Sequence, residues 1–133
     1  MRTVLCSGCF DPVHIGHVLH LEAARKHGDR LVVAMTSDMS VRKEKGEGRP
    51  LFNELQRAHM LRALRCVDQV LVVHSLMEGF RRIKPQVFVK GGDYIGRIQD
   101  EHAAYCHKHG IEIHLTTTKK WSATDIGNEL RRR

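Results

Sequence analysis

The sequence alternates between short apolar segments rich in β-branched residues and longer segments with helical periodicity. Such apolar runs predict parallel strands buried on both faces, because these strands need little polar alternation. The longer segments can carry the chain back across the sheet as helices. We therefore expect one α/β domain over residues 1–133, Rossmann-like, with a five-stranded parallel sheet and helices on both faces. The expected strands are 3–6, 30–35, 69–73, 86–89 and 111–115, and the expected helices are 16–27, 53–65, 76–83 and 98–109.

Several residues mark the ends of these helices. Asn53 and Gln56 are spaced to cap the second helix reciprocally. Gly28 and Gly110 each follow a helical pattern and precede a strand, where a left-handed cap is expected. The stretch from Arg42 to Pro50 is rich in Lys, Glu, Gly and Arg and predicts a mobile loop. The apolar stripe of the second helix consists of Leu55, Ala58, Leu61 and Leu64.

The formal net charge is +7, which favours anionic partners such as nucleotides or nucleic acid. Three of the positive charges are the terminal residues 131–133, which predict a solvated tail. Aromatic residues make up only 5% of the chain, and no recognition helix is evident, so we expect no nucleic-acid partner. No apolar run reaches the ~18–20 residues that span a bilayer. We expect a cytoplasmic protein without a membrane partner.

The segment after the first expected strand has the features of a phosphate-binding loop. Ligands of open parallel sheets bind beyond the carboxyl ends of the strands. Here Gly8 permits a tight turn, and a helix is expected to begin near Gly16, where free N–H groups and the helix dipole favour an anion. His14 and His17 are three residues apart across that helix start and can direct two imidazoles at one phosphate. Two ordinary surface histidines in a chain that has ten are the alternative.

Gly8 to His17 reads G-C-F-D-P-V-H-I-G-H and resembles the first signature of the cytidylyltransferase-like nucleotidyltransferases. Class I aminoacyl-tRNA synthetases share the H-x-G-H, but the length and the missing lysine–serine signature exclude them. The strongest resemblance is to bacterial heptose-1-phosphate adenylyltransferases, which carry G-C-F-D and K-G-G-D-Y. Glycerol-3-phosphate cytidylyltransferases come second, with an arginine at the position of Arg65. Further segments in the family's order are 28–33, 37–38, 45–46, 49–50, 56–57, 67–68 and 90–94.

The resemblance implies a single in-line displacement. A phosphate of the acceptor attacks the α-phosphorus of a nucleoside triphosphate, and pyrophosphate leaves. The lead expectation is ATP with a heptose-1-phosphate-like sugar phosphate. The alternatives are CTP with glycerol 3-phosphate or a related polyol or amino-alcohol phosphate, and an inactive nucleotide-sensing domain. Residues 119–121, Lys-Lys-Trp, replace the family's acidic-glycine pair and leave the base open.

The resemblance also implies roles for individual residues. The catalytic residues would be His14, His17 and Lys45. Asp11 would hold Mg²⁺ or another divalent cation. Arg57 and Arg65 would contact the acceptor. The expected nucleotide-binding residues are Gly8, Cys9, Phe10, Asp11, Gly16, Lys43, Gly91, Gly92, Asp93, Ser122 and Thr124. Family members are commonly dimers, so a homodimer is expected.

Cysteine and histidine patterns give two further alternatives. Cys6 and Cys9 form a C-x-x-C, which is typical of redox or half-zinc sites. Cys6 falls within a strand and no second C-x-x-C follows, so reduced thiols are favoured. A second alternative is a metal site formed by His102, Cys106, His107, His109 and His114. A surface helix that is rich in histidine explains these residues more simply.

Overall fold

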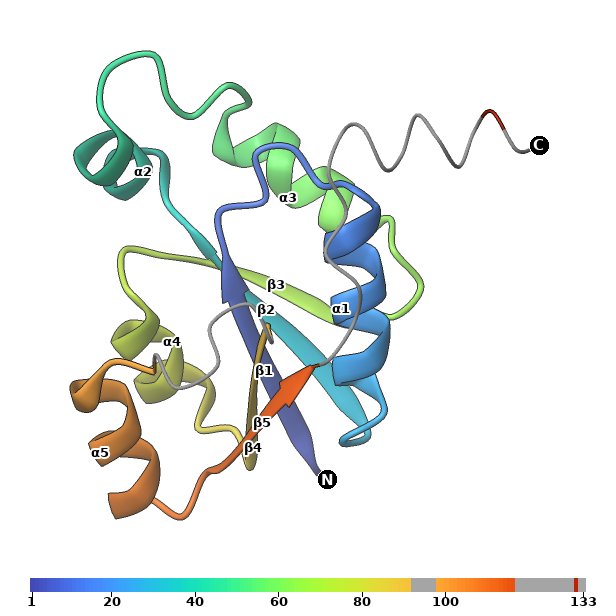
Figure 1. Ribbon diagram of the computed structural model, residues 1–133, viewed down its shortest axis with the longest axis vertical. Coiled ribbons are helices and arrows are strands. Elements are labelled where there is room, and N and C mark those ends of the chain that lie inside the picture. The colour runs from blue at the N-terminus through green and yellow to red at the C-terminus, as the bar shows by residue number, and fades with distance from the viewer. Residues whose placement is uncertain (92–97, 117–130, 132–133) are drawn as a thin grey trace.

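The computed structural model describes residues 1–91, 98–116 and 131, and in this part of the chain five strands form one parallel sheet (Figure 1). The strand order is β3-β2-β1-β4-β5. The fold class predicted from the sequence is therefore confirmed. The strands are β1 (Thr3–Gly8), β2 (Arg30–Thr36), β3 (Gln69–Val73), β4 (Val87–Gly91) and β5 (Glu112–Thr116).

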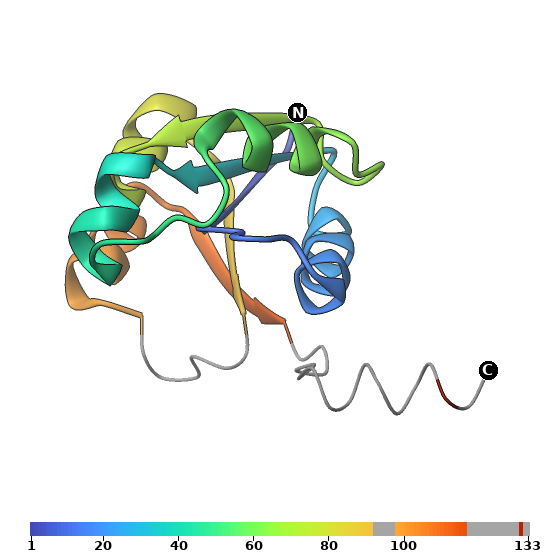
Figure 2. The ribbon, with the colours of Figure 1, turned by 90° about the horizontal axis from the view of Figure 1, so that it is seen from above.

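Helices cover both faces of the sheet (Figures 1 and 2). On one face, Leu21 of α1 and Leu61 of α3 pack with inward side chains of β1 and β2. On the other, Phe80 of α4 and Cys106 of α5 pack against alternate residues of the same strands. The helices are α1 (Ile15–Arg25), α2 (Asp38–Lys45), α3 (Glu54–Arg62), α4 (Leu76–Ile83) and α5 (Asp100–Lys108). No helix in the described residues is long and apolar enough to cross a membrane.

The strand order places a topological switch point next to β1 at the carboxyl edge of the sheet. From β1 the chain moves outward to β2 and β3, and then returns to place β4 on the other side of β1. Such a reversal separates the loops that follow the two central strands, and ligands of this fold class bind there. The loop after β1 and the end of β4 at Gly91 border this point.

The stretch predicted as a loop between Arg42 and Pro50 is instead helical as far as Lys45. Ser37 caps α2 by accepting the N–H of Ser40, and Val41 is fully buried beneath the helix. Basic side chains crowd its last turn, where they complement the helix dipole. The composition suggested a loop because Val41 is the only buried apolar anchor of α2.

The expectations for helix ends are partly confirmed. Asn53 and Gln56 form the predicted reciprocal cap, and Gly110 has the predicted left-handed backbone, with φ +67°. Gly28 does not have a positive φ. It is needed for a close approach instead, because a Cβ there would lie 2.5 Å from the carbonyl oxygen of Arg2. Leu55 is 80% exposed and lies off the buried stripe.

Candidate active site

The two histidines of the H-x-G-H motif together cap the start of α1. The Nδ1 of His14 accepts the backbone N–H of Gly16 at 3.1 Å, and the Nδ1 of His17 accepts the backbone N–H of His14 at 3.1 Å. The two rings stack with their centroids 3.8 Å apart. This arrangement is a capping box in which imidazole nitrogens replace the usual hydroxyl and carboxylate. The cap therefore fixes both rings relative to the backbone.

The cap also determines which ring nitrogen is available for a ligand. A nitrogen that accepts an N–H carries no proton, so each neutral ring holds its proton on Nε2. Within the described residues, neither Nε2 of His14 nor that of His17 has a hydrogen-bond partner. The pair thus offers two N–H donors side by side at the positive end of α1.

The surroundings keep His17 uncharged. Burial lowers the pKa of His17 to about 4, and electrostatic interactions with His14, His20 and Lys45 act in the same direction. At neutral pH the ring therefore donates as a neutral imidazole.

The loop between β1 and the histidine pair is tightly constrained. Phe10 is buried with a left-handed backbone, φ +53°, and its ring meets His17 edge to face at 5.0 Å. A Cβ on Gly8 would lie 2.9 Å from the Phe10 ring, so a side chain at Gly8 would displace it. Within the described residues, the backbone N–H groups of Cys9 and Phe10 donate to no protein acceptor. The loop therefore presents free N–H groups beside the histidines, as an anion site requires.

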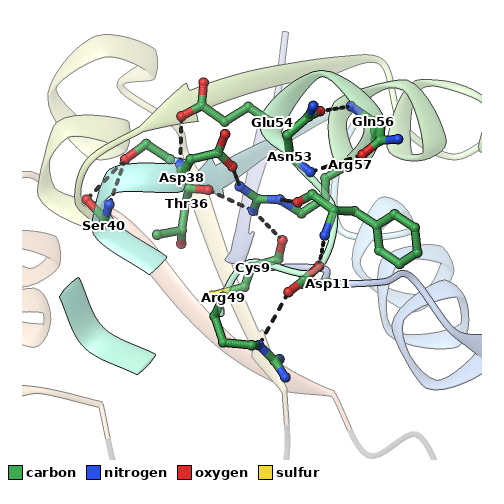
Figure 3. A network of polar contacts seen from close by, with 12 residues as sticks. Cys9, Asp11, Thr36, Asp38, Ser40, Arg49, Asn53, Glu54, Gln56 and Arg57 are labelled. Atoms are coloured by element: carbon green, nitrogen blue, oxygen red, sulfur yellow. Dashed lines mark hydrogen bonds and ion pairs between the residues drawn. The ribbon is translucent and has the colours of Figure 1, made fainter. Parts of the chain in front are cut away.

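Arg57 lies in the interior of the site's frame (Figure 3). Its side chain is 1% exposed and extends from α3. It donates to the carbonyl oxygens of Phe52, Cys9 and Thr36, each at 2.8 Å, and to a carboxylate oxygen of Asp38 at 2.7 Å. These four hydrogen bonds join the loops after β1 and β2 to the start of α3. The structure thus makes Arg57 a positioning residue and departs from the substrate contact that the resemblance implied.

Asp11 has a comparable framework role (Figure 3). Its two carboxylate oxygens accept the backbone N–H groups of Leu51 and Phe52 at 2.6 and 2.8 Å, and its side chain is 1% exposed. Burial raises the pKa of Asp11, but these hydrogen bonds and the charges of Arg49 and Arg57 outweigh it and lower the pKa overall. An enclosed carboxylate with both oxygens bonded does not fit the metal-ligand role expected for it. No group of three His, Cys, Asp or Glu side chains among the described residues is placed to hold a metal ion.

The other predicted residues lie in different parts of the chain. Lys43 and Lys45 lie exposed on the last turn of α2, and Gly91 ends β4 at the carboxyl edge of the sheet. Arg65 is exposed and precedes β3, at the opposite edge of the sheet, so the structure does not bring it to the site. Gly16 lies within the cap. Four predicted residues lie outside the described part of the chain: Gly92, Asp93, Ser122 and Thr124.

The structure does not support the redox or zinc site at Cys6 and Cys9, or the metal site formed by the His-rich set. Cys6 is fully buried in β1, burial raises the pKa of its thiol, and all four cysteines are free. The His-rich set forms no metal-binding group within the described residues. His102 packs on Phe80, His109 stacks on Tyr105, and His114 stacks on His27.

Comparison with known proteins places this geometry in context. The family model described as cytidylyltransferase-like matches residues 5–127. The bifunctional protein HldE of Geotalea uraniireducens is 50% identical over 95 residues, which is 70% of this chain and 19% of that protein. The HldE of Aliarcobacter butzleri is 46% identical over 98 residues, 72% of this chain and 21% of that protein. The chain thus spans about a fifth of the length of these curated relatives.

Solved structures of other proteins share the fold of this chain. A lipopolysaccharide core biosynthesis protein from Thermoplasma volcanium superposes with a TM-score of 0.75 and 26% identity, covering 90% of this chain and 99% of that one. A pantoate-beta-alanine ligase from Francisella tularensis, complexed with beta-gamma ATP and beta-alanine, gives 0.64 with 13% identity, covering 99% of this chain and 70% of the other. At that identity the second match supports the fold alone.

Proposed function

Since the chain belongs to the cytidylyltransferase-like family and is on that ground a nucleotidyltransferase, we propose that it transfers an adenylyl group from ATP to a sugar phosphate resembling heptose 1-phosphate. The observation that carries the proposal is the histidine pair. Its two Nε2 donors and the unbonded N–H groups of Cys9 and Phe10 belong to the segment that follows β1, at the sheet edge where ligands of this fold class bind. The match to a lipopolysaccharide core biosynthesis protein supports a sugar-derived acceptor.

The proposed step is one in-line displacement. An oxygen of the acceptor's phosphate forms a bond to the α-phosphorus of ATP, the bond from that phosphorus to the bridging oxygen breaks, and pyrophosphate leaves with the electron pair. His14 and His17 donate Nε2–H to the phosphate oxygens as negative charge redistributes, and the N–H groups of Cys9 and Phe10 hold the α-phosphate. Lys45 binds the β- and γ-phosphates. Preorganised donors of this kind are a major source of rate enhancement in phosphoryl transfer.

The metal expected with this chemistry would come with the nucleotide. Mg²⁺ retains water and is usually bound through substrate phosphates and one or two carboxylates. Because the protein encloses the Asp11 carboxylate and binds both of its oxygens, Asp11 is not assigned as a ligand of the ion. The homodimer, the cytoplasmic location and the absence of a nucleic-acid partner stay proposals, and analytical ultracentrifugation tests the first of them.

A substrate matrix tests the function. Pyrophosphate release is measured for ATP and CTP, each with heptose 1-phosphate, glycerol 3-phosphate and phosphoethanolamine. We expect the highest kcat/KM for ATP with heptose 1-phosphate. Preference for CTP with glycerol 3-phosphate would replace the proposed substrates, and ATP binding without turnover in any combination would instead support a nucleotide-sensing domain.

A further inference from the structure

A polar cleft lies beside the phosphate-binding loop, between α2 and the start of α3. Its volume is about 390 Å³, within the usual range for small-molecule pockets. Arg42 and Arg49 contribute two positive charges, Asn53 and Gln56 contribute amides, and Asp38 contributes a carboxylate. Apart from Pro50, Leu51 and Gly48, the lining is polar or charged, and it includes no aromatic ring. Such a cleft suits a small, hydroxylated anion better than a nucleobase.

Arg49 connects this cleft to the phosphate-binding loop. Its Nε lies 3.5 Å from a carboxylate oxygen of Asp11, too far for a hydrogen bond, and that buried Nε has no hydrogen-bond partner in the described part of the chain. At this distance the Asp11 carboxylate, which also accepts two backbone N–H groups, attracts the guanidinium by charge. Figure 3 shows Arg49 lying against Asp11, below the Arg57 network. The two Nη groups of Arg49 make no hydrogen bond within the described residues, and the side chain is 37% exposed, so they remain available to a ligand. A planar guanidinium suits phosphate in particular.

The amides at the start of α3 are oriented by the helix cap. The side-chain oxygen of Gln56 accepts the N–H of Asn53, and the side-chain oxygen of Asn53 accepts the N–H of Gln56. Each amide therefore presents its NH₂ group as a donor. Asp38 accepts from Arg57 through one carboxylate oxygen, and its second oxygen has no hydrogen-bond partner within the described residues. Amide donors next to a free carboxylate oxygen can bind the hydroxyl groups of a polyol.

From this combination we infer that the cleft binds the acceptor substrate, a phosphate monoester of a sugar or polyol. Arg49 binds the phosphate, while Asn53, Gln56 and Asp38 bind hydroxyl groups. This assignment rests on the proposed function, which requires an acceptor phosphate close to the nucleotide's α-phosphorus. Asp11, which touches Arg49, is the neighbour of Phe10 in the loop assigned to the α-phosphate, so the two phosphates would come together at this loop.

Steady-state kinetics of the Arg49→Gln variant distinguishes an effect on acceptor binding from an effect on nucleotide binding. Loss of a hydrogen-bonded charge predicts a rise of about 10- to 100-fold in the KM for heptose 1-phosphate, with the Kd of a non-hydrolysable ATP analogue changed less than twofold. Arg81→Gln, on the exposed surface of α4, is the control for the same change of charge. An unchanged acceptor KM, or an equal loss of ATP affinity, would overturn the assignment.

A second variant guards against a folding defect. Gln56→Glu keeps the cap, because a carboxylate at that position also accepts the N–H of Asn53, but it removes the NH₂ donor and adds negative charge. We expect an unchanged Tm and a rise of at least about fivefold in the acceptor KM. Wild-type kinetics in this variant would contradict a role in acceptor binding.

Calorimetry with heptose 1-phosphate and the same ATP analogue tests the cleft without turnover. Binding to the wild type that is lost in Arg49→Gln supports the cleft even if the substrate matrix shows no reaction, which would refute only the proposed function. Equal binding to both proteins, or no binding to the wild type, refutes the cleft.

Discussion

Two clusters of basic side chains lie at the carboxyl edge of the sheet, and they differ in what occupies their donors. In the histidine pair, the Nδ1 atoms accept backbone N–H groups and the Nε2 atoms have no partner in the described residues. In the Arg57 cluster, four donors bind carbonyl or carboxylate oxygens of the protein. Both belong to family-like motifs, but four of the five N–H donors of Arg57 bind the protein and its side chain is only 1% exposed, whereas both histidines keep an Nε2 donor for a ligand. In these two clusters, the donors that have no protein partner distinguish a ligand-binding residue from a structural one better than the residue type does.

The largest effect is expected from Arg57→Ala. It leaves three carbonyl groups and Asp38 without their donor, and loss of one partner from a buried ionic network costs about 3–5 kcal/mol. Urea unfolding measures this loss. Arg62→Ala, exposed on the same helix, is the control and should change stability by less than about 0.5 kcal/mol. If Arg57→Ala kept wild-type stability but bound the acceptor more weakly, Arg57 would be a ligand-binding residue like the histidines, and the contrast between the clusters would be wrong.

For His17→Ala we expect kcat to fall about 10²–10³-fold, as for other preorganised donors. Because His17 also caps α1, His17→Gln is the informative partner: its side-chain oxygen can accept the N–H of His14 while the imidazole is removed. Its Tm should stay close to that of the wild type, and its kcat should be lowered nearly as far as in His17→Ala. Full turnover in His17→Gln would reduce His17 to a capping residue.

Lys45→Ala should weaken binding of a non-hydrolysable ATP analogue about tenfold. This effect is at the lower end of the range for hydrogen bonds to charged groups, because the Lys45 side chain is exposed on α2. Lys108→Ala, exposed on α5, is the charge control. Titration calorimetry gives both values. The same variant should move the pKa of His17 upward, since the Lys45 charge helps to depress it. Unchanged nucleotide affinity would place Lys45 outside the site.

The smallest effect concerns pH. The pKa of His17 is about 4 in the folded protein, below the ordinary value of about 6.5, so the unfolded chain binds the proton more readily. The contribution of this histidine to stability is therefore complete above about pH 6.5 and is lost as the pH falls toward 4. An NMR titration of the His17 ring should show its midpoint near 4, and a midpoint near 6.5 would contradict the neutral donor.

Much of the fold was readable from local patterns. β-Branched apolar runs predict strands wherever both faces are covered, and the Asn53–Gln56 cap is set within four residues. Helix α2 was missed because one buried residue, Val41, anchors an otherwise charged segment. The order of the strands depends on pairing between distant segments, and the local patterns do not contain that information.

The candidate site was predicted less evenly. His14 and His17 are neighbours in sequence, so their cooperation follows from their spacing alone. The roles of Arg57 and Asp11 depend on carbonyl and N–H groups brought together by three separate loops, which residue identity does not reveal. Arg49 carries no motif signal beyond its arginine-proline pair, and only its place beside Asp11 identifies it.

A crystal structure of the full chain with a non-hydrolysable ATP analogue tests the histidine pair most directly. The account predicts phosphate oxygens within hydrogen-bond distance of Nε2 of both His14 and His17, with the cap on α1 intact. A triphosphate bound away from both rings, or rings that have left the cap to bind it through Nδ1, would contradict it.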